Sequence, residues 1–180
     1  MSLTSSLGTP AILYRKLQRE AFRAIQANRP IHKADHFFNF CITAHSMRDY
    51  CLEYLCKTEY ADQKSYHELW NKENVLVATK EIANFSKHFI LRSRRTKIPT
   101  TPSTKSVRVG KGNYFNVYQE ADGGLSFSKI TKPEVRVELS DGKIIPLYKF
   151  TDDVLDYWKS YLLSIGIKTR RVSLREYQDI

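Results

Sequence analysis

The hydrophobic pattern changes period near residue 96, and this change constrains the fold more than any other feature of the sequence. Before it, apolar residues recur at every third or fourth position, as they do on the buried face of a helix. From residue 113 onward they recur at every second position, in short runs separated by turn residues, which is typical of strands with one buried face. Helices followed by strands along one chain indicate an α+β protein.

Residues 1–95 are predicted to form an N-terminal bundle of three to four helices. The first helix follows Thr9, a good N-cap residue before a proline. The second has an unusually broad apolar surface, so we expect it to be the central core helix, with Asp35 as its N-cap. The third runs from about Asn74 to Arg92, and the phrase "SYHELW" before it indicates a short additional helix.

Residues 96–112 contain no acidic residue and are rich in basic, hydroxyl and proline residues, so they are predicted to form an exposed basic loop. Residues 113–180 are predicted to form a small antiparallel meander and a closing C-terminal helix. The strands expected in that meander are "NYFNVYQ", "LSFSKI", "EVRVEL" and "KIIPLYKF". The two halves are either separate domains or parts of one shared core, and the sequence leaves both open.

The turns and the last helix have local signals. Asp-Gly pairs at 122–123 and 141–142 indicate hairpins, and we expect type I′ turns there, which need positive φ at both central positions. The closing helix is expected to begin after Thr151 as its N-cap and to stop at Gly166, which can adopt a left-handed conformation.

The net charge of +10 is the strongest compositional signal. A basic protein of this kind tends to bind polyanions, most often nucleic acid, although many basic proteins have no such partner. No apolar run approaches the roughly 20 residues that cross a bilayer, and the N-terminus lacks the pattern of a signal peptide. We therefore expect no membrane contact.

The three cysteines do not form a disulfide framework. Cys41 and Cys51 lie about 15 Å apart along a straight helix, beyond the reach of a disulfide, and Cys51 and Cys56 have poor bridging spacing. We expect all three to be reduced core thiols, which indicates a cytoplasmic protein.

Motifs for metals and cofactors are missing from the sequence. It contains no HExxH, no CxxC, no phosphate-binding loop and no GxSxG elbow, so we expect neither a metal nor a cofactor. His32 and His36 have the spacing of a helical zinc pair, but His32 is expected to precede its helix. A metal site assembled across helices from His36, His45, Asp49 and His88 stays open.

The phrase "KEIANFSKHF" places Lys80, Asn84, Lys87 and His88 on one polar stripe of the third long helix. A histidine beside lysine and asparagine suits proton transfer at a ribose 2′-hydroxyl, because the cations stabilise phosphate charge. The alternative is a structural one, in which Asn84 and His88 each make one hydrogen bond and the two lysines are solvated.

This phrase and "ADHFFNFCITAHSMRDY" resemble phrases found in uncharacterised helical proteins of bacteria and their phages. The helical part, about residues 10–95, also resembles the HEPN superfamily, whose members are often metal-independent RNases or their inactive relatives in defence and toxin systems. The family motif has an Arg, usually followed by a polar residue, and a His four to six residues further on. The resemblance implies that His88 is the catalytic histidine and Asn84 the polar member. No Arg precedes His88 at that spacing, so Lys80, or Arg48 from the preceding helix, would take the role of the Arg.

Basic residues that directly follow the stripe are predicted to contact nucleic acid together with Lys87. They are Arg92, Arg94, Arg95 and Lys97. Aromatic residues on the next strand, Tyr114, Phe115 and Tyr118, are available for base stacking, or they pack in the core of the sheet, as hairpin aromatics more often do.

The first functional prediction is a basic accessory or defence-type protein that contacts RNA, DNA or a protein partner. One alternative is a HEPN-like metal-independent endoribonuclease, and another is a structural protein–protein interaction module. A homodimer is compatible with each.

Overall fold

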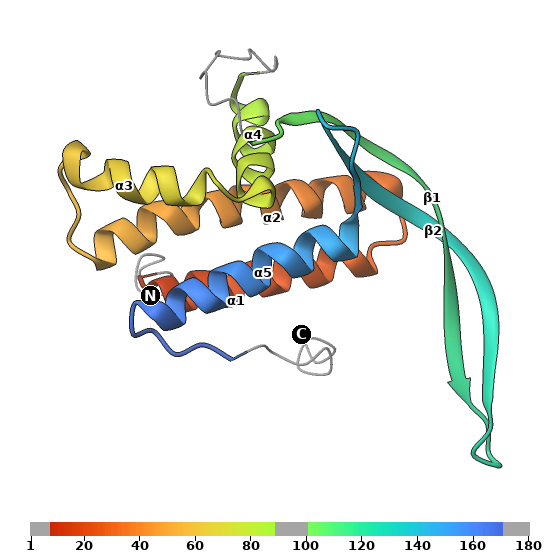
Figure 1. Ribbon diagram of the computed structural model, residues 1–180. Helices are drawn as coiled ribbons and strands as arrows, with labels where there is room; N and C mark the ends of the chain where they lie inside the picture. Colours follow the sequence, from red (N-terminus) through yellow and green to blue (C-terminus); the bar gives the residue numbers. More distant parts are fainter. Residues whose placement is uncertain (1–7, 89–100, 171–180) are drawn as a thin grey trace.

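The computed structural model describes residues 8–88 and 101–170, and the side chains of residues 86–88 lie outside that description. The described residues form five helices and one three-stranded antiparallel sheet, which confirms the predicted α+β class (Figure 1). The elements are α1 (Pro10–Gln26), α2 (Pro30–Tyr54), α3 (Tyr60–Trp70), α4 (Asn74–His88), β1 (Thr104–Gln119), β2 (Leu125–Leu139), β3 (Ile144–Pro146) and α5 (Leu147–Ser164).

The first helix begins as the sequence predicts, because the Thr9 hydroxyl accepts a hydrogen bond from the Ile12 amide at 3.3 Å. The prediction that α2 begins after Asp35 is wrong, since α2 starts at Pro30. The reason is Lys33, whose buried ammonium donates to the carbonyls of Ala24 and Ile25, both at 2.8 Å. These bonds satisfy carbonyls at the end of α1 and hold the first turn of α2 in place.

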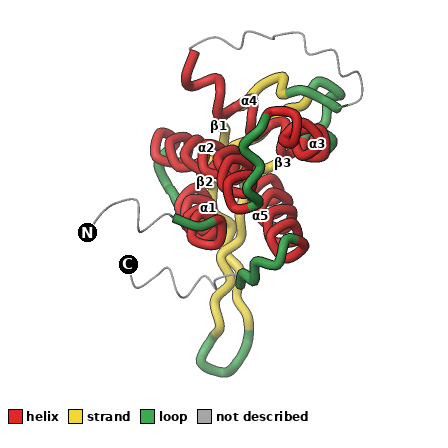
Figure 2. The backbone as a smooth tube through the Cα atoms, turned by 90° about the vertical axis from the view of Figure 1, so that its left-hand side faces the viewer, coloured by secondary structure: helices red, strands yellow, loops and turns green. Residues whose placement is uncertain are grey.

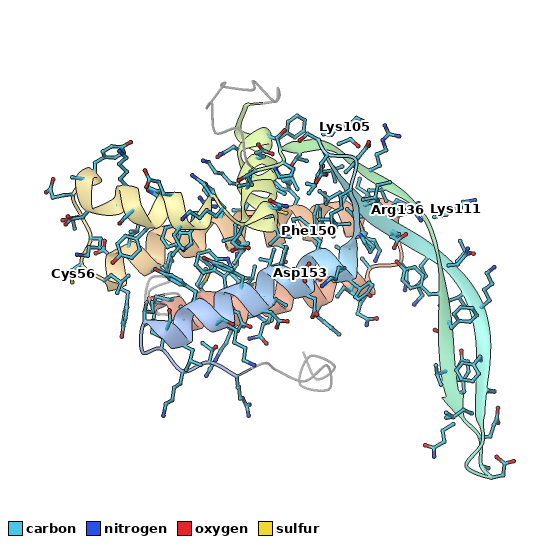
Figure 3. All side chains as sticks on the ribbon, in the orientation of Figure 1. Cys56, Lys105, Lys111, Arg136, Phe150 and Asp153 are labelled. Carbon is cyan, nitrogen blue, oxygen red and sulfur yellow. The ribbon has the colours of Figure 1, made fainter. Side chains whose placement is uncertain are left out.

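One cluster of buried side chains joins the helical half to the sheet and α5. Phe37 of α2 and Phe150 of α5 meet edge to face, with 5.5 Å between ring centroids. Figure 3 labels Phe150 on α5. The ring centroids of Trp70 on α3 and Trp158 on α5 are 5.8 Å apart. Val135, near the end of β2, is fully buried in the same cluster. The two halves therefore share one core.

The strands are fewer and longer than the four short runs expected. β1 begins at Thr104, so residues 104–112, assigned to the basic loop, are strand. Two expected runs form one strand, because β2 continues through Thr131, Lys132 and Pro133 without a turn. β3 is only three residues long, and α5 begins at Leu147, four residues before Thr151.

Both hairpin turns lie where the Asp-Gly pairs predict, but they are not type I′. Gly123 and Gly142 have positive φ, of 86° and 85°, and no other residue of these two turns does. Elsewhere in the described part of the chain, Cys56 is the one non-glycine residue with positive φ. Each turn is a three-residue loop, because Glu120 and Gly124 pair around the first and Leu139 and Lys143 around the second. A left-handed glycine at the third loop position is the usual solution for this loop length.

The hairpin of β1 and β2 extends far beyond the helices as an arm (Figures 1 and 2). β3 pairs only with Arg136–Glu138 of β2, so the outer part of the hairpin is a two-stranded ribbon. At about 3.4 Å per residue, the 16 residues of β1 are about 50 Å long. Residues 104–112 and 132–139 are called the proximal arm, and residues 113–131 the distal arm.

The cysteines are free thiols, and Cys41 and Cys51 are buried as expected. Cys56 is exposed at the end of α2, so its assignment to the core is wrong (Figure 3). Its φ of 54° places it in the turn after the helix, where the backbone leaves the core.

Candidate functional site

The polar stripe predicted on the third long helix lies on α4. Lys80 and Asn84 are half-buried there. Lys87 and His88 belong to α4 by their backbone, but their side chains lie outside the description. The predicted nucleic-acid ligands Arg92, Arg94, Arg95 and Lys97 lie outside the described residues altogether.

Arg48, the proposed substitute for the family's arginine, is buried in the middle of α2 with 2% of its surface exposed. Its guanidinium donates to the Asn71 side-chain oxygen and to the Leu76 carbonyl, each at 3.1 Å. The same group lies over the ring of Trp70, 5.8 Å from its centroid. These contacts tie α2 to the turn between α3 and α4, which is a structural task.

A cationic cluster formed by Arg48, His67 and Lys80 lies where α2, α3 and α4 meet. His67 packs edge to face on Trp70, with 5.8 Å between centroids, on the ring that Arg48 also contacts. Burial and the charges of Arg48 and Lys80 lower the pKa of His67, and burial and the charge of Arg48 lower the pKa of Lys80. Both groups are therefore held in an environment that disfavours further positive charge.

His67 was not among the site residues predicted from the sequence. The available signal was the spacing of His67 and Trp70, which are three residues apart and so share one face of a helix. What the sequence did not show is that this face turns toward Arg48, because that depends on how α3 packs across α2. Of the predicted catalytic set, the structure brings Arg48 and Lys80 within electrostatic range of each other.

A second group of cations lines the proximal arm (Figure 3). Arg108 and Arg136 are direct cross-strand partners, and both are exposed. Glu134 accepts from Arg136 at 2.9 Å, whereas no acceptor for Arg108 lies within hydrogen-bonding distance in the described part of the chain. Like charges directly opposite in a sheet are destabilising, so this pair is suited to an anion that bridges it.

Further cations extend this face of the arm. Lys132 lies two positions from Glu134 along β2, on the same face. Burial, and after it the charge of Lys132, lowers the pKa of Lys33. Lys105 is exposed near the start of β1 and pairs with Glu138 at 2.6 Å. The four cations outnumber the two carboxylates on this face. We call it the outer face of the proximal arm, since Val135 and Val137 on the opposite face are buried in the core.

Aromatic residues of the distal arm are largely exposed rather than packed in a sheet core. Phe115 is 66% exposed and Tyr118 is 52% exposed. Tyr114 is half-buried, and burial raises its pKa. Both strands of the distal arm are edges, so neither face is covered by another layer.

One hollow in the surface is lined by residues other than the predicted site residues. A surface hollow of about 410 Å³ between α4 and α5 has Lys72, Glu73, Lys143, Asp153 and Asp156 in its lining. Within residues 8–88 and 101–170, no three or more His, Cys, Asp or Glu side chains are grouped so that they could hold a metal ion. In the same ranges, every helix is too short or too polar to span a bilayer.

Comparison with known proteins adds no relative. No protein-family model matches the chain, and neither a curated protein nor a solved structure matches it.

Proposed function

We propose that this protein is a basic accessory protein that binds nucleic acid with the outer face of its proximal arm. The observation that carries the proposal is the exposed cross-strand pair of Arg108 and Arg136. An arginine presents a planar set of donors that matches phosphate oxygens, and two of them side by side on a ribbon can hold one phosphate or two neighbouring ones. Their mutual repulsion is relieved when that anion is present.

The placement of this pair supports the same function. Val135 and Val137 on the opposite face of the proximal arm are fully buried, so this part of the arm presents mainly its charged outer face to a ligand. Contacts from such a face go to the phosphate backbone and carry no sequence information. Binding through the phosphate backbone is therefore expected with both DNA and RNA.

The test is fluorescence anisotropy of a short labelled DNA duplex, titrated with the full chain at salt concentrations from about 50 to about 200 mM. We expect the logarithm of the affinity to fall linearly with the logarithm of the salt concentration. Replacing both arginines (Arg108→Gln with Arg136→Gln) removes two phosphate contacts, so the slope should decrease by about 2.

The matched control is Arg15→Gln with Arg23→Gln, which removes two exposed arginines from α1 and leaves the same net charge as the arm variant. A purely global charge effect would weaken binding equally in both variants, and that outcome would contradict the proposal. So would absence of binding by the wild type at low salt. Single-stranded DNA and RNA of the same length establish the preferred form.

A metal-independent endoribonuclease is the second candidate, favoured by the cluster of Arg48, His67 and Lys80. With its pKa lowered, His67 is a neutral imidazole near pH 7 and can accept a proton. Lys80 makes no hydrogen bond or ion pair within the part of the chain that the structure describes, so its ammonium is available to a phosphate. His88, predicted for the same role, follows on the same helix.

RNA cleavage in the presence of EDTA tests this candidate. An active site at the cluster predicts that cleavage persists in EDTA and falls by about 10²-fold or more in His67→Gln. Loss of cleavage in His88→Ala instead would move the histidine to the position that the family resemblance implies. His32→Gln, an exposed histidine at the start of α2, is the control. No cleavage of several RNAs by the wild type would reject the candidate.

A further inference from the structure

The face that carries the arginine pair continues from the proximal arm into the distal arm (Figures 1 and 2). In an antiparallel ribbon, directly opposed residues point to the same side, and so do residues two positions apart along one strand. The register therefore puts Tyr114 and Tyr118 of β1 on the same side as Arg108 and Arg136. We call this side the outer face of the distal arm. Phe115, which lies between the two tyrosines in the sequence, belongs to the opposite face.

The outer face changes from charged to aromatic between the base of the arm and its tip. In the distal arm its residues are, in order toward the tip, Tyr114 beside Ile130, Asn116 beside Ser128, and Tyr118 beside Ser126. None of these residues is charged. Glu120 ends the face at the tip, where its amide donates to the Gly124 carbonyl at 2.8 Å. Phosphates are therefore attracted to the base of the outer face, and rings and short polar side chains follow.

Tyr114 leans along β1 toward the arginine pair. A Cβ atom at Gly112 would lie 2.9 Å from Tyr114 Cε2 and 2.9 Å from Glu134 Cβ, so the missing side chain at Gly112 leaves the space in which the ring lies. Burial raises the pKa of Tyr114, Glu134 raises it further, and Arg136 lowers it. Its phenol is thus within electrostatic range of the charged groups on β2, and the charged and aromatic parts of the outer face are continuous.

Tyr118 leans in the same direction. The Asn116 side-chain amide, two positions nearer the base, donates to the Tyr118 hydroxyl at 3.0 Å. The Tyr118 side chain remains 52% exposed. Tyr114 and Tyr118 are four positions apart on one strand, or about 14 Å. Two rings held along a ribbon and open to solvent are suited to stacking with flat aromatic ligands such as nucleic-acid bases.

We infer that the arm binds single-stranded nucleic acid, with phosphates at the arginine pair and unpaired bases stacked on Tyr114 and Tyr118. The inference rests on the proposed function and adds the form of the nucleic acid. Bases in a duplex stack on one another, so their faces are not open to a side chain, whereas a single strand offers both its phosphates and its bases. Every base has an aromatic face, so we expect little dependence on sequence.

The opposite face of the distal arm is less suited to a single strand. Two of its exposed side chains, Val117 and Leu125, are aliphatic and offer no ring to a base. Toward the base of the arm this face is closed, because Val135 and Val137 are fully buried in the core. A strand that followed the opposite face would therefore not reach the arginine pair.

The first measurement separates the contribution of the bases from that of the phosphates. Fluorescence anisotropy compares the full chain binding a labelled oligothymidylate of about 15 nucleotides with its binding of an abasic strand of the same length. The wild type should bind the oligothymidylate about tenfold more tightly or better. Tyr114→Ser with Tyr118→Ser should abolish that difference and leave the affinity for a duplex unchanged. Neither tyrosine belongs to the buried core, so we expect this variant to fold.

Oligouridylate of the same length should lose affinity in the same proportion, because stacking does not involve the sugar. Its affinity relative to oligothymidylate in the wild type identifies RNA or DNA as the preferred single strand.

The matched control is Phe115→Ser with Phe127→Ser, which removes two exposed rings from the opposite face of the same arm and should leave binding of the oligothymidylate unchanged. Tyr114→Phe with Tyr118→Phe keeps both rings and should bind it within about twofold of the wild type. Tyr118→Ser alone, at the more exposed of the two rings, should give part of the loss and tests the inference independently of Gly112 and Tyr114.

The slope of affinity against salt distinguishes this inference from the proposed function. The tyrosine variants remove no charge and should keep the wild-type slope, whereas replacing Arg108 and Arg136 decreases it. If only the arginine variant changes binding, the proposed function stands and this inference is wrong. Equal losses in the tyrosine and phenylalanine variants, or equal wild-type affinity for the abasic strand and the oligothymidylate, also overturn the inference. Absence of binding to every strand at low salt overturns both.

Discussion

Trp158→Ala is expected to lower the free energy of unfolding by about 3–5 kcal/mol. Trp158 is fully buried on α5, and its ring lies 5.8 Å from that of Trp70 on α3 and 5.7 Å from that of Tyr161. Removing the indole leaves a cavity between elements that are far apart in the sequence, so the surrounding helices cannot close it by local movement. The loss is a large part of the stability of an ordinary domain.

Urea denaturation followed by far-UV circular dichroism measures this loss. Trp158→Phe is the informative companion, because the Trp158 indole N–H has no hydrogen-bond partner within the described residues. Phenylalanine fills most of the space and removes that buried donor, so its cost should be less than half that of alanine. Tyr60→Ala, at a side chain that is 78% exposed, should change stability by less than about 0.5 kcal/mol. Equal losses for the alanine and phenylalanine variants would contradict the packing argument.

The features that could be predicted from the sequence are those with local causes. The change of hydrophobic period sets the α+β class, and the Thr9 side chain caps α1 as its residue type indicates. Both hairpin turns contain the Asp-Gly pairs, because glycine adopts a positive φ without the steric cost that a side chain adds. The predicted turn type, type I′, was wrong, since the length of the loop and not the dipeptide alone selects the turn.

The features that could not be predicted depend on contacts between distant residues. Pro133 indicated a break between two strands, but it lies within β2, paired with Lys111 of β1. A proline is tolerated in a ribbon whose strands are both edges, because a missing donor there leaves no neighbour unpaired. With Asp35 as the expected N-cap, Lys33 would lie before the second helix, but it lies within α2 and is buried because the end of α1 supplies two carbonyls. Pairing register and helix packing leave no mark on local composition.

The candidate sites likewise have some features that residue types predicted and others that depend on strand register and helix packing. The basic character of the chain indicated a polyanion partner, but the exposed pair of Arg108 and Arg136 depends on a register that brings positions 28 residues apart together. Lys80 and Arg48 were named from residue types, whereas His67 joins them only because α3 packs beside α2. The roles predicted for Asn84, Lys87 and His88 stay predictions.

Arg48→Met is expected to lower the free energy of unfolding by about 2–4 kcal/mol. Methionine keeps the apolar stem but removes the donors that Arg48 supplies to Asn71 and Leu76. The Leu76 carbonyl still accepts from the Thr79 hydroxyl at 2.9 Å, so most of the cost arises at the Asn71 oxygen and from the lost contact with Trp70. Arg48→Lys keeps the charge but not the two-armed geometry, and it should fall between methionine and the wild type. Arg15→Met, at an exposed arginine of α1, is the control and should be near neutral.

The same variant tests the cationic cluster through its protonation. Because the charge of Arg48 helps to lower the pKa of His67, Arg48→Met should raise that pKa toward the ordinary value, which proton NMR can follow. A histidine whose pKa is lower in the folded chain binds its proton more readily when unfolded, so wild-type stability falls as the pH drops through the ordinary histidine pKa. That decrease should be smaller in Arg48→Met and unchanged in Arg15→Met. An unchanged His67 titration in Arg48→Met would show that the two groups are not coupled and would remove the basis for placing a ribonuclease site there.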